Sequence, residues 1–151
     1  MSDSHEYHEI ILPNKFSESE VSQAKEYWAN IKPYGQKAAI WSTDLAKKII
    51  SLNPAKVFEF GCNSGKNLLE IKRLGNSKAE CFGVDINVES IRDARERGLN
   101  VAVASEEILS VFPSNTFDVA FTVLVLDHLP EPVSALIELE RISKSLFLLE
   151  P

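Results

Sequence analysis

Hydrophobic positions along the chain switch between helical and extended spacing, and the first two patterned stretches are helical. Apolar residues recur every three or four positions within 36–52, which predicts a helix with one buried face. Ser17 and Glu20 form a capping box, in which each side chain binds the backbone amide of the other residue. We therefore expect an earlier helix over about 17–30, and we group residues 1–54 as an amino-terminal helical cap segment.

After this segment, short apolar runs of extended character alternate with helical segments. Strands are predicted over 56–60, 80–85, 100–104, 117–125 and 145–149. The fourth of these runs is nearly all apolar and rich in β-branched residues, which is typical of a central strand buried on both faces. Between the strands, the pattern predicts helices over 66–74, 87–97 and 132–142, and a short turn or helix over 106–109.

This alternation predicts an α/β fold with a doubly wound, mostly parallel sheet and helices on both faces. The length of 151 residues fits one domain, whose core would be residues 55–151. In such a fold a ligand binds beyond the carboxyl ends of the strands, where the strand order reverses. Candidate chemistry should therefore lie directly after the first, second and fourth predicted strands.

Charge and composition narrow the possible functions. The net charge of −6 and the scattered Lys and Arg residues make a nucleic-acid partner improbable. No run approaches the roughly 18 apolar residues of a membrane span, and the first residues carry no secretion signal. Two cysteines, Cys62 and Cys81, are too few for a disulfide scaffold or a cysteine zinc site. We therefore expect a cytoplasmic protein without a membrane or metal partner.

Two glycines, Gly61 and Gly65, follow the first predicted strand and precede a helix. Glycine allows a sharp turn and the close approach of a ligand to the backbone, and the start of the helix offers unpaired amides. A dinucleotide-binding turn needs G-x-G-x-x-G, but Asn63 and Lys66 replace two of those glycines. A phosphate-binding loop needs four residues between its glycines, and here there are three. A turn without any ligand stays possible.

Asp85 ends the second predicted strand. A carboxylate at this point of a doubly wound fold lies beside the first glycine turn and can accept hydrogen bonds from both hydroxyls of a ribose. The alternative is that Asp85 caps the next helix, although Asn87 is better placed to do so. Ribose binding is the favoured interpretation.

Taken together, these residues resemble the class I S-adenosylmethionine-dependent methyltransferases of the type 11 group. The resemblance covers about residues 55–151. The acidic–x–Gly–x–x–x–Gly motif of the family matches Glu59 to Gly65, and its acidic residue after the second strand matches Asp85. Looser matches are Ser105-Glu106 after the third strand, residues 117–130 with a histidine turn, and residues 146–150.

The resemblance implies a Rossmann-like methyltransferase core that binds S-adenosyl-L-methionine. Asp85 would hold the ribose hydroxyls, Ile86 would pack on the adenine, and Leu126 would lie under the sulfonium end. Ser105 and Glu106 would face the amino edge of the adenine. The glycine turn would pass beneath the methionine and ribose parts of the cofactor through Glu59, Gly61, Cys62, Asn63 and Gly65.

The implied reaction is displacement of an activated methyl group by a nucleophile of the acceptor, so positioning and exclusion of water do much of the work. His128 is the candidate general base, because histidine exchanges protons near neutral pH. Asp127 would orient His128 or bind the acceptor. A purely structural role for His128 in the turn before Pro130 is equally open. The acidic chain slightly favours a small-molecule acceptor.

The chain ends where the family continues with a helix and an antiparallel pair of strands. We therefore expect a core that lacks these final strands, with the strand over 145–149 as an exposed edge that can pair with a second copy. Methyl transfer to a small molecule is the first functional interpretation. A non-catalytic S-adenosylmethionine-binding or scaffold module is the second. A nicotinamide oxidoreductase is disfavoured by Asn63 and Lys66.

Overall fold

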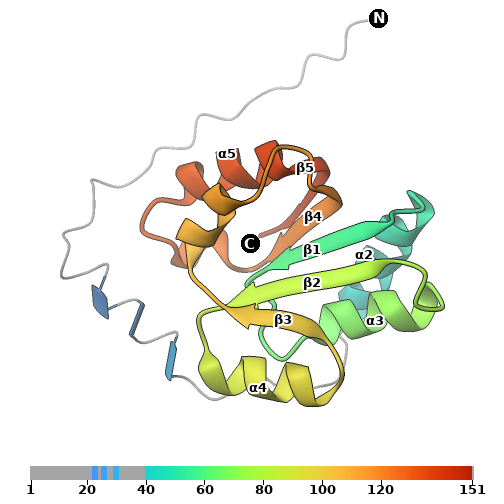
Figure 1. Cartoon of the computed structure of the whole chain (residues 1–151), viewed down its shortest axis with the longest axis horizontal. Helices are drawn as coiled ribbons and strands as arrows, with labels where there is room; N and C mark the ends of the chain where they lie inside the picture. The colour runs from blue at the N-terminus through green and yellow to red at the C-terminus, as the bar shows by residue number, and fades with distance from the viewer. Residues whose placement is uncertain (1–21, 24, 27–28, 31–39, 151) are drawn as a thin grey trace, which may run out of the picture.

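The computed structural model describes residues 22–23, 25–26, 29–30 and 40–150. Figure 1 shows the strands side by side in one sheet, with helices on both of its faces. The α-helices and short 3-10 helices (η) alternate with the strands in the order α2 (Ile40–Ser51), β1 (Lys56–Phe60), α3 (Lys66–Leu74), β2 (Glu80–Asp85), α4 (Val88–Glu96), β3 (Asn100–Val103), η1 (Glu106–Val111), β4 (Phe117–Val123), η2 (Leu126–His128), α5 (Pro132–Ile142) and β5 (Ser143–Leu149).

The amino-terminal helices agree with the prediction wherever the structure describes them. The described residues between 22 and 30 are helical, and α2 fits within the helix predicted over 36–52. Ser17 and Glu20, which carry the predicted capping box, lie outside the described residues. The division into a cap segment and a core therefore stays a prediction.

All neighbouring strands of the sheet run parallel, in the order β3-β2-β1-β4-β5. The chain moves outward from β1 to β3 and then returns to the other side of β1 to form β4. Phe60, at the end of β1, lies opposite Val84 of β2 and Thr122 of β4. The predicted doubly wound fold is confirmed, and the strand order reverses at the carboxyl end of β1, where a ligand site is expected.

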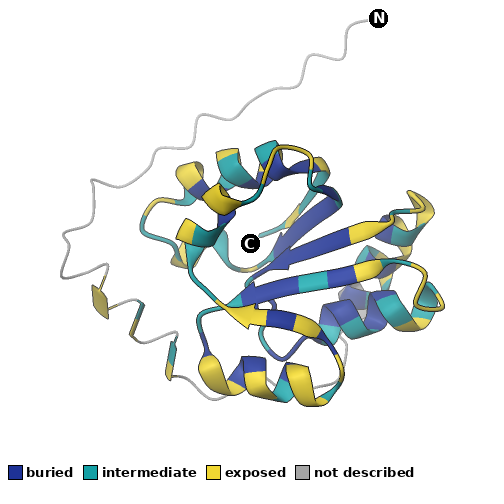
Figure 2. Ribbon diagram, in the orientation of Figure 1, coloured by how far each residue is buried: buried dark blue, intermediate teal, exposed yellow. Residues whose placement is uncertain are grey.

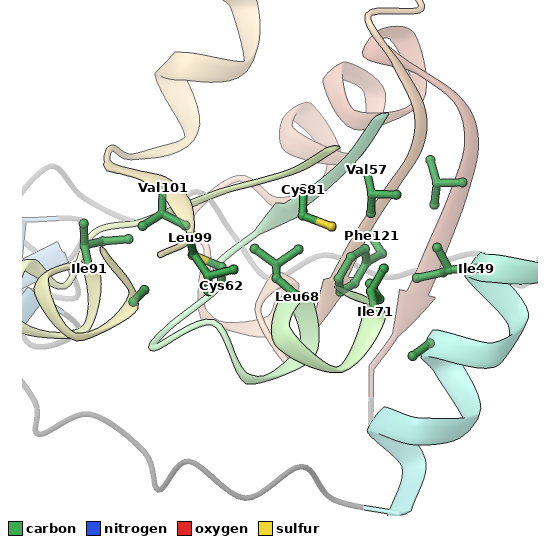
Figure 3. Close-up of a cluster of buried hydrophobic side chains, with 13 residues drawn as sticks. Ile49, Val57, Cys62, Leu68, Ile71, Cys81, Ile91, Leu99, Val101 and Phe121 are labelled. Carbon is green, nitrogen blue, oxygen red and sulfur yellow. The ribbon is translucent and has the colours of Figure 1, made fainter. Parts of the chain in front are cut away.

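Two hydrophobic layers enclose the sheet. Side chains from α2, α3 and α4 pack on one face, where Leu68 and Ile71 of α3 meet Val57 and Phe121 (Figure 3). The helices α5 and η1 cover the other face, as shown by the buried Leu139 and its neighbours. Figure 2 shows burial concentrated on the inner strands and on the helix faces turned toward them. Burial on both faces explains why the inner strand β4 is mostly apolar.

Local signals set most of the element boundaries. The strands β1 and β2 and the helices α3 and α5 have the predicted limits. Gly75 ends α3 with its amide bound to the carbonyl of Ile71, and the Asn87 side chain caps α4 by accepting a hydrogen bond from the Ser90 amide. Asn is a favoured residue type at the start of a helix. At Gly75 the φ is −88°, and space favours glycine there, because a Cβ atom would lie 2.9 Å from the Ile71 carbonyl oxygen.

Two strand boundaries differ from the prediction by two residues. The strand β4 ends at Val123 rather than at 125, because Leu124 has a positive φ of 54° and donates its amide to the carbonyl of Leu149. The strand β5 begins at Ser143 rather than at 145, directly after α5. The Ser143 hydroxyl ends the helix by donating to the Leu139 carbonyl, so no loop is needed.

Among the described strands, β5 has a neighbour on one side only and forms an edge of the sheet. Pairing of this edge with a second copy stays a prediction. None of the helices described is both long enough and apolar enough to span a membrane.

Candidate functional site

A cavity of about 330 Å³ lies at the carboxyl ends of β1, β2 and β4. Its place matches the reversal in strand order, and its volume falls within the range of small-molecule sites, roughly 300–1,000 Å³. The structure brings most of the predicted site residues together around it. Those that line the cavity are Glu59, Gly61, Cys62, Asn63, Asp85, Ile86, Ser105, Glu106 and His128.

Three predicted site residues do not line the cavity. Gly65 is packed beneath the turn against Leu99, and Leu126 packs into the core on the side of α5. Asp127 lies beside His128 with its side chain 47% exposed. The wall that we expected Leu126 to form is provided instead by the residues just before it, Val123, Leu124 and Val125. This shift follows from the early end of β4.

Sequence reasoning missed several residues of the cavity wall. Lys66 and Asn67 follow Gly65 directly, so their place at the start of α3 was a usable signal. Lys25 comes from the amino-terminal segment, and its position depends on tertiary contacts that no local pattern reveals. The other missed residues are Phe60, Val84, Asn87, Ala104, Val123, Leu124, Val125, Leu129 and Pro130.

Both glycines of the turn after β1 are required by the backbone and by space. Gly61 has a φ of 77°, and a Cβ atom there would lie 2.4 Å from Cγ2 of Val125. Gly65 has a φ of 82°, and its Cβ would lie 2.1 Å from Cδ1 of Leu99. The amides of Gly61 and Cys62 both donate to the carbonyl of Val84, which ties the turn to the end of β2. The backbone of the turn therefore reaches the cavity in one fixed conformation.

Cys62 fills the space beneath this turn. It is buried and packs over Gly83 of β2, where a Cβ atom would lie 2.8 Å from the Cys62 sulfur. Burial raises the pKa of the Cys62 thiol well above its usual range, and the carboxylates of Glu59 and Asp85 act in the same direction. A small side chain that fits a tight turn explains Cys62 better than a reactive thiol does.

Asp85 holds the glycine turn and the start of α4 together. Its Oδ2 accepts a hydrogen bond of 2.8 Å from the Asn63 amide, and its Oδ1 accepts one of 2.8 Å from the Asn87 amide. Burial raises the pKa of the Asp85 carboxyl, and hydrogen bonds from the backbone of Asn87 and Asn63 oppose that shift. A carboxylate has about four acceptor sites on its two oxygens, so Asp85 can bind hydroxyl groups of a ligand in addition to its backbone donors.

Glu59 is the most deeply buried charged group of the cavity wall, with 1% of its surface exposed. Its Oε1 accepts a hydrogen bond of 2.7 Å from the Asn67 side chain, and Asn67 accepts one of 2.7 Å from the Ser42 hydroxyl. Its Oε2 has no hydrogen-bond partner among the described residues. Burial raises the pKa of the Glu59 carboxyl well above its usual range. An unsatisfied carboxylate oxygen at a cavity wall is suited to a cationic ligand group.

The amino-terminal segment reaches the cavity through Lys25. Its Nζ lies 2.9 Å from a carboxylate oxygen of Glu107 and 3.4 Å from one of Glu106, both in η1. The Lys25 hydrogen bond lowers the pKa of Glu107 to about 2, and the Ser105 hydroxyl, which also binds Glu107, acts in the same direction. Ser105 and Glu106 therefore stand at the end of the cavity that the amino-terminal segment adjoins.

The short helix η2 carries the histidine of the site. The Nε2 atom of His128 lies 3.5 Å from Oδ1 of Asp127, and their side chains are 37% and 47% exposed. The His128 amide donates to the carbonyl of Val125, which closes the turn. His128 lines the cavity, so its side chain is within reach of a molecule bound there.

Within the described part of the chain, no group of three or more His, Cys, Asp or Glu residues is arranged to hold a metal ion. The polar groups of the cavity instead suit an organic ligand that combines hydroxyls with positive charge. Asp85 offers acceptors for hydroxyls, Glu59 offers an oxygen for a cation, and Gly61 admits the ligand close to the backbone.

Comparison with known proteins identifies the family. The family model of the methyltransferase domain matches residues 58–146, more than half of the chain. The chain belongs to the methyltransferase domain family. The matched residues include the glycine turn, Asp85 and His128. The resemblance predicted from the sequence motifs is therefore confirmed.

A protein of Schizosaccharomyces pombe described as "Uncharacterized methyltransferase C1B3.06c" is 29% identical over 140 residues. The match covers 78% of this chain and 48% of the relative, so the chain spans about half the length of that protein.

Solved methyltransferase structures share the fold of this chain. The N-terminal domain of EvdMO1, solved in the presence of SAH (S-adenosylhomocysteine) and D-fucose, has a TM-score of 0.63 and 20% identity. That match covers 84% of this chain and 61% of the EvdMO1 chain. A SAM-dependent methyltransferase from Archaeoglobus fulgidus has a TM-score of 0.56 and 25% identity, covering 69% of this chain and 48% of its own. These similarities confirm the Rossmann-like methyltransferase core.

Proposed function

We propose that the chain binds S-adenosyl-L-methionine and supports transfer of its methyl group to a small-molecule acceptor by direct displacement. The observation that carries this proposal is the place of Glu59. Its side chain is buried, and one of its two carboxylate oxygens has no hydrogen-bond partner among the described residues. It lines the cavity together with Asp85, beside the glycine turn of a methyltransferase-family sheet. A nicotinamide dinucleotide would bring two phosphates against these carboxylates, whereas this methyl donor brings none and carries positive charge.

The residues of the cavity fit the parts of this cofactor. The unsatisfied Oε2 of Glu59 suits the ammonium group of the methionine part, and Gly61 lets the ligand approach the backbone. Asp85 has acceptor capacity for the ribose hydroxyls. Ile86, Ser105 and Glu106 would then surround the adenine, as the resemblance implies, with Lys25 bound to Glu106 beyond them.

The cofactor supplies a methyl group already activated on a sulfonium ion. The acceptor's nucleophilic atom forms a bond to the methyl carbon as the carbon–sulfur bond breaks, and the bonding electron pair stays on sulfur. The protein must therefore align the two molecules and exclude water. In this proposal His128, which lines the cavity, accepts the proton that the acceptor loses, and Asp127, 3.5 Å away, orients its imidazole.

A small acceptor fits the site better than a nucleic acid does. The described lining residues combine apolar groups, such as Leu129 and Pro130, with carboxylates, and the chain has a net charge of −6. A polyanion would be repelled by this charge. We also infer a cytoplasmic location, because the two cysteines, Cys62 and Cys81, are free and buried, which suits a reducing compartment.

The proposal can be tested with S-adenosylmethionine labelled in its methyl group and a panel of small alcohols, amines, thiols and carboxylic acids. We expect labelled product from one class of acceptor with the wild-type chain, and at least about tenfold less with Asp85→Ala at a fixed, subsaturating cofactor concentration. Glu140→Ala, a change on the exposed face of α5, is the matched control. Binding of the cofactor without transfer to any acceptor would favour a non-catalytic binding module instead.

A further inference from the structure

The residue after β5, Glu150, binds the turn that follows β4. Its Oε1 lies 3.3 Å from the amide nitrogens of both Val125 and Leu126, which are 25 and 24 positions earlier in the chain. The Leu124 amide donates at 2.8 Å to the carbonyl of Leu149. Three successive amides of this turn are therefore bound by the carboxyl end of a neighbouring strand.

Two of these amides, those of Val125 and Leu126, lie at the start of the short helix η2, and no side chain of that helix binds them. The helix η2 (Leu126–His128) is closed by bonds from the His128 amide to the Val125 carbonyl and from the Leu129 amide to the Leu126 carbonyl. No side chain within the turn caps its first amides. A carboxylate that accepts from such amides supplies the hydrogen-bond partner that they lack within the turn. The Glu150 side chain therefore caps η2 from the neighbouring strand.

The conformation held in this way is unusual and faces the cavity. Leu124 has a φ of 54°, which side chains other than glycine rarely adopt, and it is 47% exposed although it is a large apolar residue. Such conformations persist where the surrounding structure enforces them. On the same turn, Val125 packs over Gly61, and both Val125 and His128 line the cavity.

We infer that Glu150 is a positioning residue, whose carboxylate fixes the turn after β4 so that Val125 and His128 stand at the cavity. Its importance for methyl transfer rests on the proposed function, but its control of the turn does not. Without the carboxylate, the amides of Val125 and Leu126 lose their acceptor, and the turn can leave the conformation that places His128.

The test uses the whole chain and compares Glu150→Ala with Glu150→Gln, which keeps an acceptor oxygen at the same reach. Hydrogen exchange followed by NMR reports on the Val125 and Leu126 amides. The imidazole signal of His128 is readily assigned, because the chain has three histidines and a His128→Gln variant removes one signal. Glu140→Ala removes an exposed carboxylate and serves as the control.

We expect exchange at Val125 and Leu126 to become at least about tenfold faster in Glu150→Ala, with the His128 signal shifted or broadened, while amides of β1 stay protected. Glu150→Gln should resemble the wild type. Exchange within twofold of the wild type in Glu150→Ala, or an unchanged His128 signal, would overturn the inference.

If Glu150→Ala does not fold, Glu150→Asp replaces it, since its carboxylate is too short to reach the turn. Faster exchange of the Val125 and Leu126 amides in the Asp variant than in the Gln variant would support the inference, because only the longer side chain can reach these amides. The opposite order would overturn it. Titration of the same samples with S-adenosylhomocysteine separates the two proposals. Failure of the wild type to bind would count against the proposed cofactor while leaving the exchange result decisive for Glu150.

Discussion

Replacing Glu59 by Gln should change stability and cofactor binding in opposite directions. The substitution keeps the shape of the side chain and the acceptor for the Asn67 amide group, but it removes the negative charge. Glu59 is almost completely buried, and one of its oxygens has no partner among the described residues. The charge is therefore costly in the free protein and useful only when a cation occupies the cavity.

The stability effect has a defined dependence on pH. Burial raises the pKa of Glu59 in the folded chain, so the folded state keeps this proton to a higher pH than the unfolded state does. The free energy of unfolding therefore falls as pH rises from the unfolded pKa toward the folded pKa, by roughly 1.4 kcal/mol for each unit of difference. Glu59→Gln removes this loss. The variant should gain stability relative to the wild type between pH 4 and pH 8.

The binding effect follows from a charge-assisted hydrogen bond. If Oε2 of Glu59 accepts from the ammonium group of S-adenosylmethionine, losing the charge costs about 1.5–3 kcal/mol. This corresponds to roughly 10- to 150-fold weaker binding.

Urea denaturation from pH 4 to pH 8 measures the stability change, and calorimetric titration measures the affinity. Glu140→Gln, which also removes one carboxylate but on an exposed position, is the control for net charge. Equal affinity of Glu59→Gln and the wild type would refute the assignment of Glu59 to the cofactor. A stability difference that does not grow with pH would refute the account of its buried charge.

Three further substitutions test other parts of the site. Asp85→Ala should weaken S-adenosylmethionine binding at least about tenfold, since the ribose hydroxyls lose their acceptor; unchanged affinity in calorimetry would exclude ribose binding. His128→Ala should lower turnover in the labelled-methyl assay while affinity for S-adenosylhomocysteine stays within about twofold; unchanged turnover would assign His128 a structural role. Gly65→Ala should destabilise the fold more than Gly98→Ala does. Both glycines have a positive φ, which costs an alanine about 1–2 kcal/mol, but a Cβ at Gly65 also meets Leu99, whereas nothing lies within 4 Å at Gly98. Equal losses in urea denaturation would contradict the packing of the turn.

The sequence predicts elements well where local chemistry sets their ends. Gly75 marks a helix end by leaving room for a close backbone contact, and Asn87 marks one by capping, so the sequence predicts the limits of α3 and α4 closely. The end of β4 depends instead on contacts with Leu149 and Glu150, 25 residues later, while the apolar pattern runs on without a break. For that reason the prediction continued β4 too far and placed Leu126 at the cavity.

The site residues, like the element boundaries, are predictable from the sequence only where the signal is local. The glycine turn and Asp85 are recognisable because a strand end next to a glycine is a local pattern. The bond between Asn67 and Glu59, and the contact of Lys25 with Glu107, join separate elements. Neither pairing has a signature in the sequence, because each depends on which elements meet in the folded chain.

The central claim is that this cavity binds S-adenosylmethionine. The most direct measurement is calorimetric titration of the folded chain with S-adenosylmethionine and, in parallel, with NAD, with circular dichroism confirming the fold of the same sample. We predict micromolar, one-to-one binding of the methyl donor and no binding of NAD. A folded chain that binds NAD, or that binds neither molecule, would contradict the claim.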